Sequence, residues 1–455
     1  MHIAAQQRLS LSPDRPAQSA AVTWLTYLSV ALSLGVSAPL LTVLGVPYDA
    51  PTGSFVFKIH PGTYALGAAF ALVLAERGNP IAELWRSLAH QPAVAFYLLA
   101  DALVTGFSVF RHGFSGAAFF VDAQLAPGVL ALLLARLDVA ALRRLFLLVV
   151  TFLALNAALG VAEQLLQARL IPLTVAGGQE LGEAVFRATA LTGHPLSGAA
   201  VTALALFAFW GLADARARVA LCWLAIVALL SFGGRTSLGL SLALFGVLLA
   251  GTGLAALRQR RVAYRAVTGG AALAVLLAGG VALAVAFGGV GERILGKLAW
   301  DESAEVREVS LTVYELLRPE QLLFGVSPDE IGGLIRRLGL DYPYETIENF
   351  WIVLSLQLGV PFFLLFVAGF LALLLHLARI SAMPMRLALL GFVLAASTNN
   401  SLSAKTTALS AVVIIVYGGA AHRLRSGRSS AGLQSGPAQP HQRGLQLAPS
   451  SSQKL

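Results

Sequence analysis

Charged residues are scarce in this sequence. Asp, Glu, Lys and Arg together make up 12% of its 455 residues, against roughly 25% in soluble globular proteins. Hydrophobic residues account for 57% of the chain, which excludes both a water-soluble enzyme and a disordered protein. Cysteine is almost absent as well. The single Cys222 lies in an apolar run, so neither a disulfide framework nor a cysteine-based zinc site can form.

The sequence contains many long apolar runs. Runs of about 20 apolar residues are long enough to cross a hydrocarbon core about 30 Å thick. We therefore predict an all-α polytopic bundle of about 12 transmembrane helices with a small helical module on its outer side. The expected spans lie at 22–45, 60–75, 92–110, 114–135, 145–167, 192–212, 217–232, 236–254, 266–288, 350–377, 386–400 and 405–421.

The distribution of Lys and Arg indicates how the bundle is oriented. Short loops such as 136–144 and 258–265 are rich in arginine, which is typical of the cytoplasmic side. The first 21 residues lack a compact charged region, so the first apolar run is expected to be a retained span rather than a cleaved signal. We expect both termini in the cytoplasm. The predicted organisation is an N-terminal segment (1–21), spans 1 to 9 (22–288), a large outer loop (289–349), spans 10 to 12 (350–421) and a disordered cytoplasmic tail (422–455).

The large loop differs from the rest of the chain in charge. Within 289–349 there are 12 acidic and 6 basic residues, although the whole chain has a net charge of +9. The remaining basic residues punctuate apolar spans, so a nucleic-acid partner is not expected. Apolar residues at helical spacing predict an amphipathic helix at 306–317. The Ser327-Pro328-Asp329-Glu330 sequence predicts a second helix with a capping box, ending near Leu338 before Gly339.

Three acidic residues fall inside predicted spans: Asp101, Asp122 and Glu163. A carboxylate at the centre of a transmembrane helix costs roughly 2.5–3.5 kcal/mol, so each should face the bundle interior and find a partner. One interpretation is a path for protons or substrate, and the other is a structural hydrogen-bonding role. The structural role is favoured for Asp101 and Asp122, and the two are balanced for Glu163.

Two outer turns contain candidate binding residues. Arg187 and His194 lie in the sequence Arg-Ala-Thr-Ala-Leu-Thr-Gly-His-Pro, which ends at a helix entrance, and an interfacial arginine with an ordinary turn is the alternative. Arg235 follows Gly233-Gly234 and starts a helix. Free backbone N–H groups, the helix dipole and a guanidinium favour an anion there, for which a diphosphate is the natural membrane-surface choice. A hairpin with a snorkelling arginine is the alternative.

Further candidates lie in and after the large loop. Arg307 has acidic neighbours, so a local salt bridge is one explanation for it. Glu348-Asn349 precedes Phe350-Trp351, where a carboxylate could act as a general base for a hydroxyl and the aromatic rings could pack on sugars. The aromatic residues equally suit an interfacial belt. We find no nucleotide, metal or redox motif in a fitting context, so no cofactor is expected.

The order of these motifs resembles the superfamily of O-antigen ligases and bacterial polysaccharide polymerases. Phe120-Val121-Asp122-Ala123-Gln124-Leu125-Ala126-Pro127 looks like the superfamily's Asp-containing span, and Arg187 to Pro195 is similar to its Arg-then-Pro segment. Arg235-Thr236-Ser237 looks like its Ser-Arg turn, with Gly234 in place of the Ser. Arg307 matches the arginine early in the periplasmic loop, and Leu323-Phe324-Gly325-Val326 resembles its Gly-X-Gly step, with Ser327 replacing the second Gly.

This resemblance implies a metal-independent, inverting glycosyltransferase with a GT-C-like bundle. In such enzymes an acceptor hydroxyl attacks a sugar held on undecaprenyl diphosphate while arginines bind the diphosphate. By this resemblance Arg235 and Arg307 hold the diphosphate with help from Arg187, while Glu348 is the base and His194 an alternative base. Asn349 and Trp351 are the remaining substrate contacts.

One departure from the pattern affects which member of the superfamily is expected. Ligases have His before the Asn, whereas this chain has Glu348. We therefore predict a polymerase of exopolysaccharide or O-antigen repeats, with a ligase as the alternative and a secondary transporter or exporter as the alternative from another class. The expected partners are the lipid-linked saccharide and membrane lipid, with a chain-length regulator and a flippase as further candidates. The resemblance also implies that the protein lies in the inner membrane of a bacterium, with its large loop in the periplasm.

Overall fold

The computed structural model describes residues 18–50, 53–76, 78–172, 186–212, 214–258, 309–339, 347, 349–398 and 405–432. Every regular element within these residues is helical. Six helices are long and apolar enough to cross a membrane, and the chain is therefore a multi-pass membrane protein. These six are Pro92–Phe114, Ala117–Leu134, Val139–Leu166, Ala215–Phe232, Arg235–Ala255 and Phe350–Ile380, and shorter apolar helices accompany them at Ala20–Gly35, Pro61–Ala75, Pro195–Trp210, Met383–Ala396 and Ala408–His422.

The elements of the first half of the chain are α2 (Ala20–Gly35), α3 (Ala38–Val43), η1 (Phe55–Lys58), α4 (Pro61–Ala75), α5 (Pro80–His90), α6 (Pro92–Phe120), the π-helix η2 (Val121–Leu125), α7 (Ala126–Leu134) and α8 (Val139–Leu166). The later elements are η3 (Ala190–Thr192), α9 (Pro195–Trp210), α10 (Ala215–Phe232), α11 (Arg235–Arg258), η4 (Thr312–Leu316), α15 (Pro319–Phe324), α16 (Pro328–Arg337), α17 (Phe350–Ile380), α18 (Met383–Ala396) and α19 (Ala408–Gly432).

Short polar residues start several of these helices. Asp138 accepts the Ala141 N–H at 2.6 Å at the start of α8, and Asp214 accepts the Ala217 N–H at 3.0 Å at the start of α10. Asn349 caps α17 in the same way. Such caps satisfy backbone N–H groups that have no partner within the helix. The caps therefore fix where the polar loops end and the apolar helices begin.

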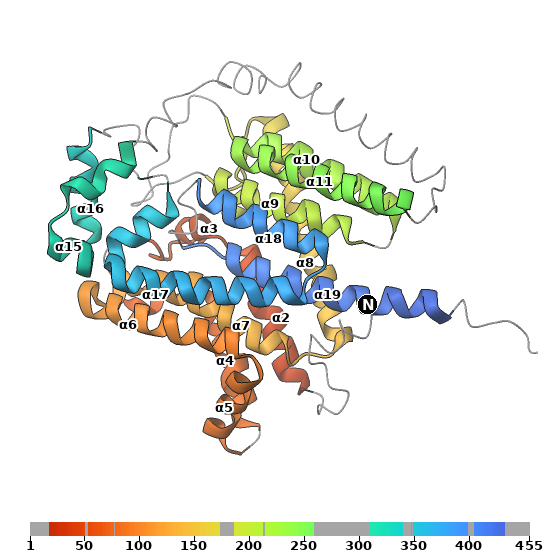
Figure 1. Cartoon of the computed structure of the whole chain (residues 1–455), viewed down its shortest axis with the longest axis horizontal. Coiled ribbons are helices and arrows are strands. Elements are labelled where there is room, and N and C mark those ends of the chain that lie inside the picture. The colour runs from red at the N-terminus through yellow and green to blue at the C-terminus, as the bar shows by residue number, and fades with distance from the viewer. Residues whose placement is uncertain are drawn as a thin grey trace, which may run out of the picture.

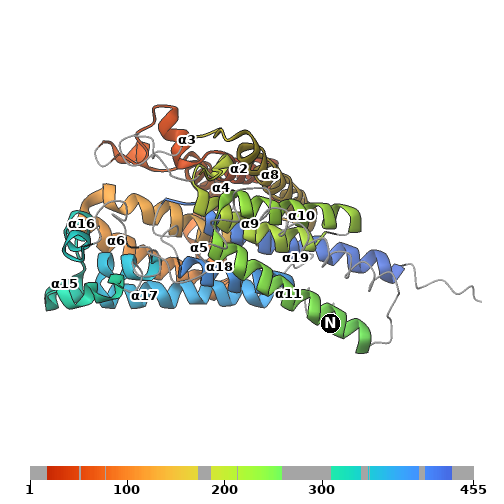
Figure 2. The same ribbon diagram turned by 90° about the horizontal axis from the view of Figure 1, so that it is seen from above.

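The long helices form one bundle, in which α6 and α17 lie side by side in both views (Figures 1 and 2). Helix α19 runs through the bundle, and its residues from Ala408 to Ala421 are almost all buried. Helices α15 and α16 lie beyond one end of the bundle, and the C-terminal end of α19 projects from the opposite end (Figure 1). We call η4, α15 and α16 the module, and the end of the bundle next to them the module end.

The helices at the module end have a hydrophobic core of their own. Val313, Val326, Ile331 and Leu334 are buried together with Leu356 from the first part of α17. The capping box of α16 is confirmed: Ser327 Oγ accepts the Glu330 N–H at 3.3 Å, and the Glu330 carboxylate accepts the Ser327 N–H at 2.8 Å. The first part of α17 therefore packs with the module as well as with the bundle.

Three features differ from the predicted helices. The first span was expected at 22–45, but α2 ends at Gly35 and a separate helix, α3, begins at Ala38, because Pro39 is tolerated in a first turn but not in a helix interior. The part of 306–317 that the structure describes forms the 3₁₀-helix η4 rather than a longer α-helix. Helix α19 continues to Gly432, beyond the predicted end at 421. The predicted span 266–288 lies outside the described residues, and the other predicted spans each overlap a helix.

Two of the long helices are broken near the module end. Gly113 in α6 has φ 74°, ψ 176°, and Gly359 in α17 has φ 68°, ψ 164°. These positive φ values favour glycine. The His112 ring and the Gln357 carbonyl oxygen lie 3.4 Å apart, so the two breaks face each other. The Gly113 break falls between the predicted spans 92–110 and 114–135, whereas the Gly359 break lies inside the predicted span 350–377.

Candidate functional site

Glu163, near the end of α8, organises the chain that follows this helix. Its buried carboxylate accepts backbone N–H groups from Leu170 at 2.6 Å, Thr189 at 2.7 Å and Ala190 at 2.8 Å. Hydrogen bonds to a charged acceptor are among the strongest in proteins. These contacts support the structural interpretation of Glu163. They hold in place the segment that contains Arg187.

Backbone contacts bring Arg187, His194 and Arg235 to one corner of the bundle, which we call the arginine corner. The Ala188 N–H donates to the Ser231 carbonyl at 3.1 Å, so the segment with Arg187 lies against the end of α10. Arg235 follows that end after only two glycines.

Close helix packing forms the rest of this corner. A Cβ on Gly198 of α9 would lie 2.7 Å from Phe232 of α10, and one on Gly234 would lie 2.5 Å from the Ala199 side chain. Gly160 of α8 meets the same Phe232 ring from the other helix, with an imagined Cβ 2.6 Å away. The starts of α9 and α11 are thereby held against the end of α10.

The arginine corner combines several features that attract anions. Arg187 and Arg235 are half-buried, and His194 is exposed at the N-cap of α9, where its Nδ1 accepts the Leu196 N–H at 3.2 Å. The N-termini of α9 and α11 both point into this corner, and helix N-termini have a partial positive charge. The corner can therefore hold a negatively charged group at the end of an apolar bundle.

Arg169 is a further cation beside this corner that sequence reasoning did not single out. Its Nε donates to the Arg187 carbonyl at 3.1 Å, and its guanidinium lies 5.0 Å from the centre of the Phe186 ring. The only signal for Arg169 in the sequence is weak: it is one of few basic residues in the short loops expected on the outer side of the membrane.

Asn349 and Trp351 contact a different element, the end of α18. Asn349 Oδ1 accepts the Trp351 N–H at 2.9 Å, and its Nδ2 donates to the Ser397 carbonyl at 3.2 Å. Trp351 Nε1 donates to Ser397 Oγ at 2.8 Å, and its ring packs within an aromatic cluster. Both side chains are engaged in local structure. They fix the start of α17 against α18, which in turn packs on α9 and α11.

Glu348 and Arg307 lie outside the described residues. The sequence-based hypotheses for these two residues therefore remain predictions. Glu348 directly precedes Asn349, whose hydrogen bonds fix the backbone at the start of α17.

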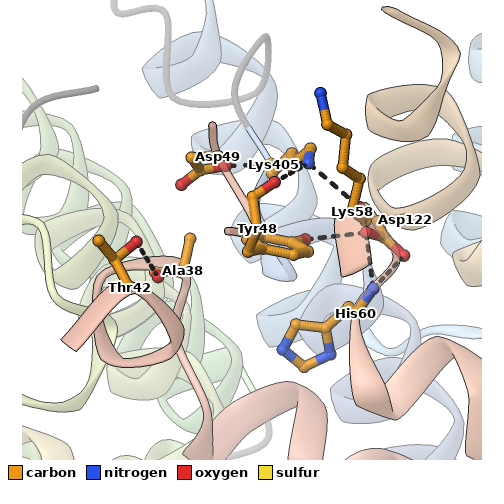
Figure 3. A network of polar contacts seen from close by, with 8 residues as sticks. All are labelled: Ala38, Thr42, Tyr48, Asp49, Lys58, His60, Asp122 and Lys405. Carbon is orange, nitrogen blue, oxygen red and sulfur yellow. Dashed lines mark hydrogen bonds and ion pairs between the residues drawn. The ribbon is translucent and has the colours of Figure 1, made fainter. Parts of the chain in front are cut away.

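A polar network lies beside α3 (Figure 3). Asp122, in the π-helix η2, accepts the Tyr48 hydroxyl at 2.8 Å and the His60 backbone N–H at 2.9 Å. The His60 ring in turn caps α4 by accepting the Gly62 N–H at 3.0 Å, while its Nε2 lies 2.7 Å from the Val36 carbonyl. Asp122 therefore has the structural role that the sequence analysis favoured.

Lys405 connects this network to the chain after α18. Its Nζ donates to the carbonyl oxygens of Tyr48 at 2.5 Å and Lys58 at 3.1 Å, and lies 3.9 Å from the Asp49 carboxylate. Burial lowers the pKa of Lys405 below its ordinary value, while the Asp49 and Asp122 carboxylates oppose that effect. The Lys58 side chain points away from these carboxylates (Figure 3).

The fold and these sites define a helical, multi-pass membrane protein with a basic corner at one end. No known family model matches the chain, and no curated protein matches its sequence.

Proposed function

We propose that the protein is a glycosyltransferase that polymerises saccharide repeats linked to undecaprenyl diphosphate, at the module end of the bundle. The observation that best supports this is the arginine corner. There Arg187 and Arg235 lie beside the N-termini of α9 and α11, at the end of an otherwise apolar bundle. Such a corner suits a diphosphate whose lipid tail extends along the apolar helices.

In this proposal the cations stabilise the leaving group. As the bond between the anomeric carbon and the diphosphate oxygen breaks, negative charge grows on the diphosphate. Guanidinium groups and helix N-termini fixed in advance stabilise that charge more in the transition state than in the bound substrate. Arg307 of the large loop is the third arginine that we propose to contact the diphosphate.

The proposed base is Glu348. An acceptor hydroxyl attacks the anomeric carbon, and its proton passes to the Glu348 carboxylate while undecaprenyl diphosphate leaves from the opposite face. The configuration at the anomeric carbon is therefore inverted. Asn349 is assigned a positioning role, because its amide group is occupied by α17 and Ser397. A ligase would use the same chemistry with a different acceptor.

The test uses full-length protein in liposomes with a lipid-linked repeat. We expect Arg235→Gln to reduce chain extension by about 100-fold or more, the size of effect seen when one donor to a developing anion is removed. Glu348→Gln should be similarly impaired. The matched control is Arg258→Gln at the far end of α11, where the arginine is exposed. Chain extension at the wild-type rate by the Arg235→Gln variant would show that the arginine corner is not part of the catalytic site.

One observation favours the transporter as a second candidate. Helix α17, which the sequence predicts as one continuous span, is broken at Gly359. Broken helices are typical of substrate and ion sites in secondary transporters. Uptake of a saccharide that depends on an ion gradient, and that is lost when Gly359 is replaced by Leu, would support this class.

A further inference from the structure

Asp101 on α6 differs from the other two carboxylates of the predicted spans. Its residue is only 1% exposed, and neither carboxylate oxygen has a hydrogen-bond partner within the described part of the chain. Asp122 and Glu163, in contrast, each accept several hydrogen bonds. A buried, ionised carboxylate without a partner is strongly unfavourable in an apolar interior.

The charges on the neighbouring elements do not compensate for this burial. Asp122 is bonded to Tyr48 and His60, and Glu83 of α5 pairs with Arg86 and Arg136 at 2.5 Å each. The ionisable side chains on the elements packed against α6 are Glu83, Arg86 and His90 of α5, Lys58 of η1, Asp122 of η2, and His376 and Arg379 of α17.

A row of polar side chains runs from Asp101 toward the module end. Thr105 follows after four residues, Ser108 after three more and His112 after another four, so all lie on one face of α6. The Thr105 hydroxyl is buried without a partner among the described residues, and Ser108 is 2% exposed. His112 lies at the facing breaks of α6 and α17.

We infer that Asp101 is a proton-binding site in the interior of the bundle, which gains and loses its proton along Thr105, Ser108 and His112. The protonated carboxyl group of Asp101 is neutral, so its burial at the apolar contact with α17 no longer destabilises the fold. This contact is close, because a Cβ on Gly369 of α17 would lie 2.8 Å from the Ala100 side chain. The site is independent of the proposed glycosyl transfer.

The first test is chemical labelling of the full-length protein in liposomes with dicyclohexylcarbodiimide. This lipophilic reagent reacts with protonated carboxyl groups inside membranes: the acid O–H adds across a C=N bond, and the adduct rearranges to a stable N-acylurea without a leaving group. We expect label on Asp101 at neutral pH and none on Asp122 or Glu163, whose carboxyl oxygens are occupied by hydrogen bonds from the surrounding chain. Label that is absent from Asp101, or equal on all three, would contradict the inference.

Infrared spectroscopy provides a second reading that does not depend on access of the reagent. Wild-type protein should show the carbonyl band of a protonated carboxyl, and Asp101→Asn should lose it. In deuterated water the band should shift, and Ser108→Ala should slow that shift severalfold. Thr252→Val on the exposed side of α11 is the control. Identical spectra for wild type and Asp101→Asn would overturn the proton site, and an unchanged exchange rate in Ser108→Ala would overturn the path.

Discussion

Individual carboxylates at the module end act mainly through backbone N–H groups. Glu163 holds the segment with Arg187, and Asp122 holds His60 at the start of α4. In a region with little water, such bonds replace the hydration that a polar backbone would otherwise need. Residues far from any substrate therefore determine where the candidate site residues lie.

Glu163→Gln tests this role. The amide can accept fewer and weaker hydrogen bonds than the carboxylate does from Leu170, Thr189 and Ala190, so we expect a loss of roughly 1.5–3 kcal/mol in stability. Thermal unfolding in detergent measures the change. Glu320→Gln, on the exposed first turn of α15, should stay within about 0.5 kcal/mol. Equal effects of the two variants would contradict the assignment.

Gly198→Ala tests the close packing at the arginine corner. The new methyl group would overlap the Phe232 ring, and overpacking of this kind typically costs about 1–3 kcal/mol. Gly239→Ala in α11 is the matched control, because no atom lies within 4 Å of the added Cβ. There we expect a gain of about 0.5–1 kcal/mol from helix propensity. A neutral Gly198→Ala would show that the corner tolerates separation of α9 and α10.

At the residue scale, sequence reasoning found the local signals and missed the distant partners. His194 and Arg235 became candidates because each stands in a short turn beside a proline or glycines, and Arg187 because it precedes the same turn as His194. The contact of Lys405 with Tyr48 could not be identified, because the two residues are separated by 357 positions and neither has a local pattern that names the other.

At the scale of elements, hydropathy predicted most helices, because each helix either packs an apolar surface against its neighbours or exposes that surface to lipid. It did not predict the break at Gly359, because a glycine inside an apolar run leaves the mean hydropathy almost unchanged. The capping box of α16 was predictable, because its hydrogen bonds join residues only three positions apart.

Acid should loosen α16 through this capping box. The Ser327 backbone N–H lowers the pKa of Glu330 below its ordinary value. The carboxylate therefore stabilises the helix fully above its unfolded pKa, and this contribution disappears as the pH falls through the folded pKa.

Hydrogen exchange of the α16 amides against pH measures this effect. Glu330→Gln should remove the acid dependence, and Ser327→Ala should weaken the helix by about 1 kcal/mol. Glu315→Gln, exposed on the same module, should leave the dependence intact. An acid dependence that persists in Glu330→Gln would exclude this carboxylate as its source.

Gly359→Ala should disturb the contact between the module and α17. A Cβ at Gly359 would collide with the Leu323 carbonyl, and its positive φ is unfavourable for alanine. We expect faster proteolysis of residues 309–339 with little change in the rest of the bundle. Gly106→Ala in α6, where the added Cβ meets no atom within 4 Å, is the control. Equal proteolysis of both variants would show that the contact between Gly359 and Leu323 does not hold the module in place.

At the scale of the whole molecule, long-range contacts at the module end bring together separate parts of the chain. The Val326 N–H donates to the Leu356 carbonyl at 2.7 Å, which joins the module to α17. Lys405 joins the chain after α18 to the loop before α4. The proposed chemistry depends on this assembly, because Arg187, His194 and Arg235 lie between α8 and the start of α11, whereas Asn349 caps α17.

The most direct test of glycosyl transfer is chain extension by purified full-length protein in sealed liposomes with a lipid-linked repeat and no ion gradient. The account predicts a ladder of longer lipid-linked saccharides together with released undecaprenyl diphosphate, and neither product from Arg235→Gln. Movement of the saccharide across the membrane only when an ion gradient is applied, with no change in its length, would contradict it.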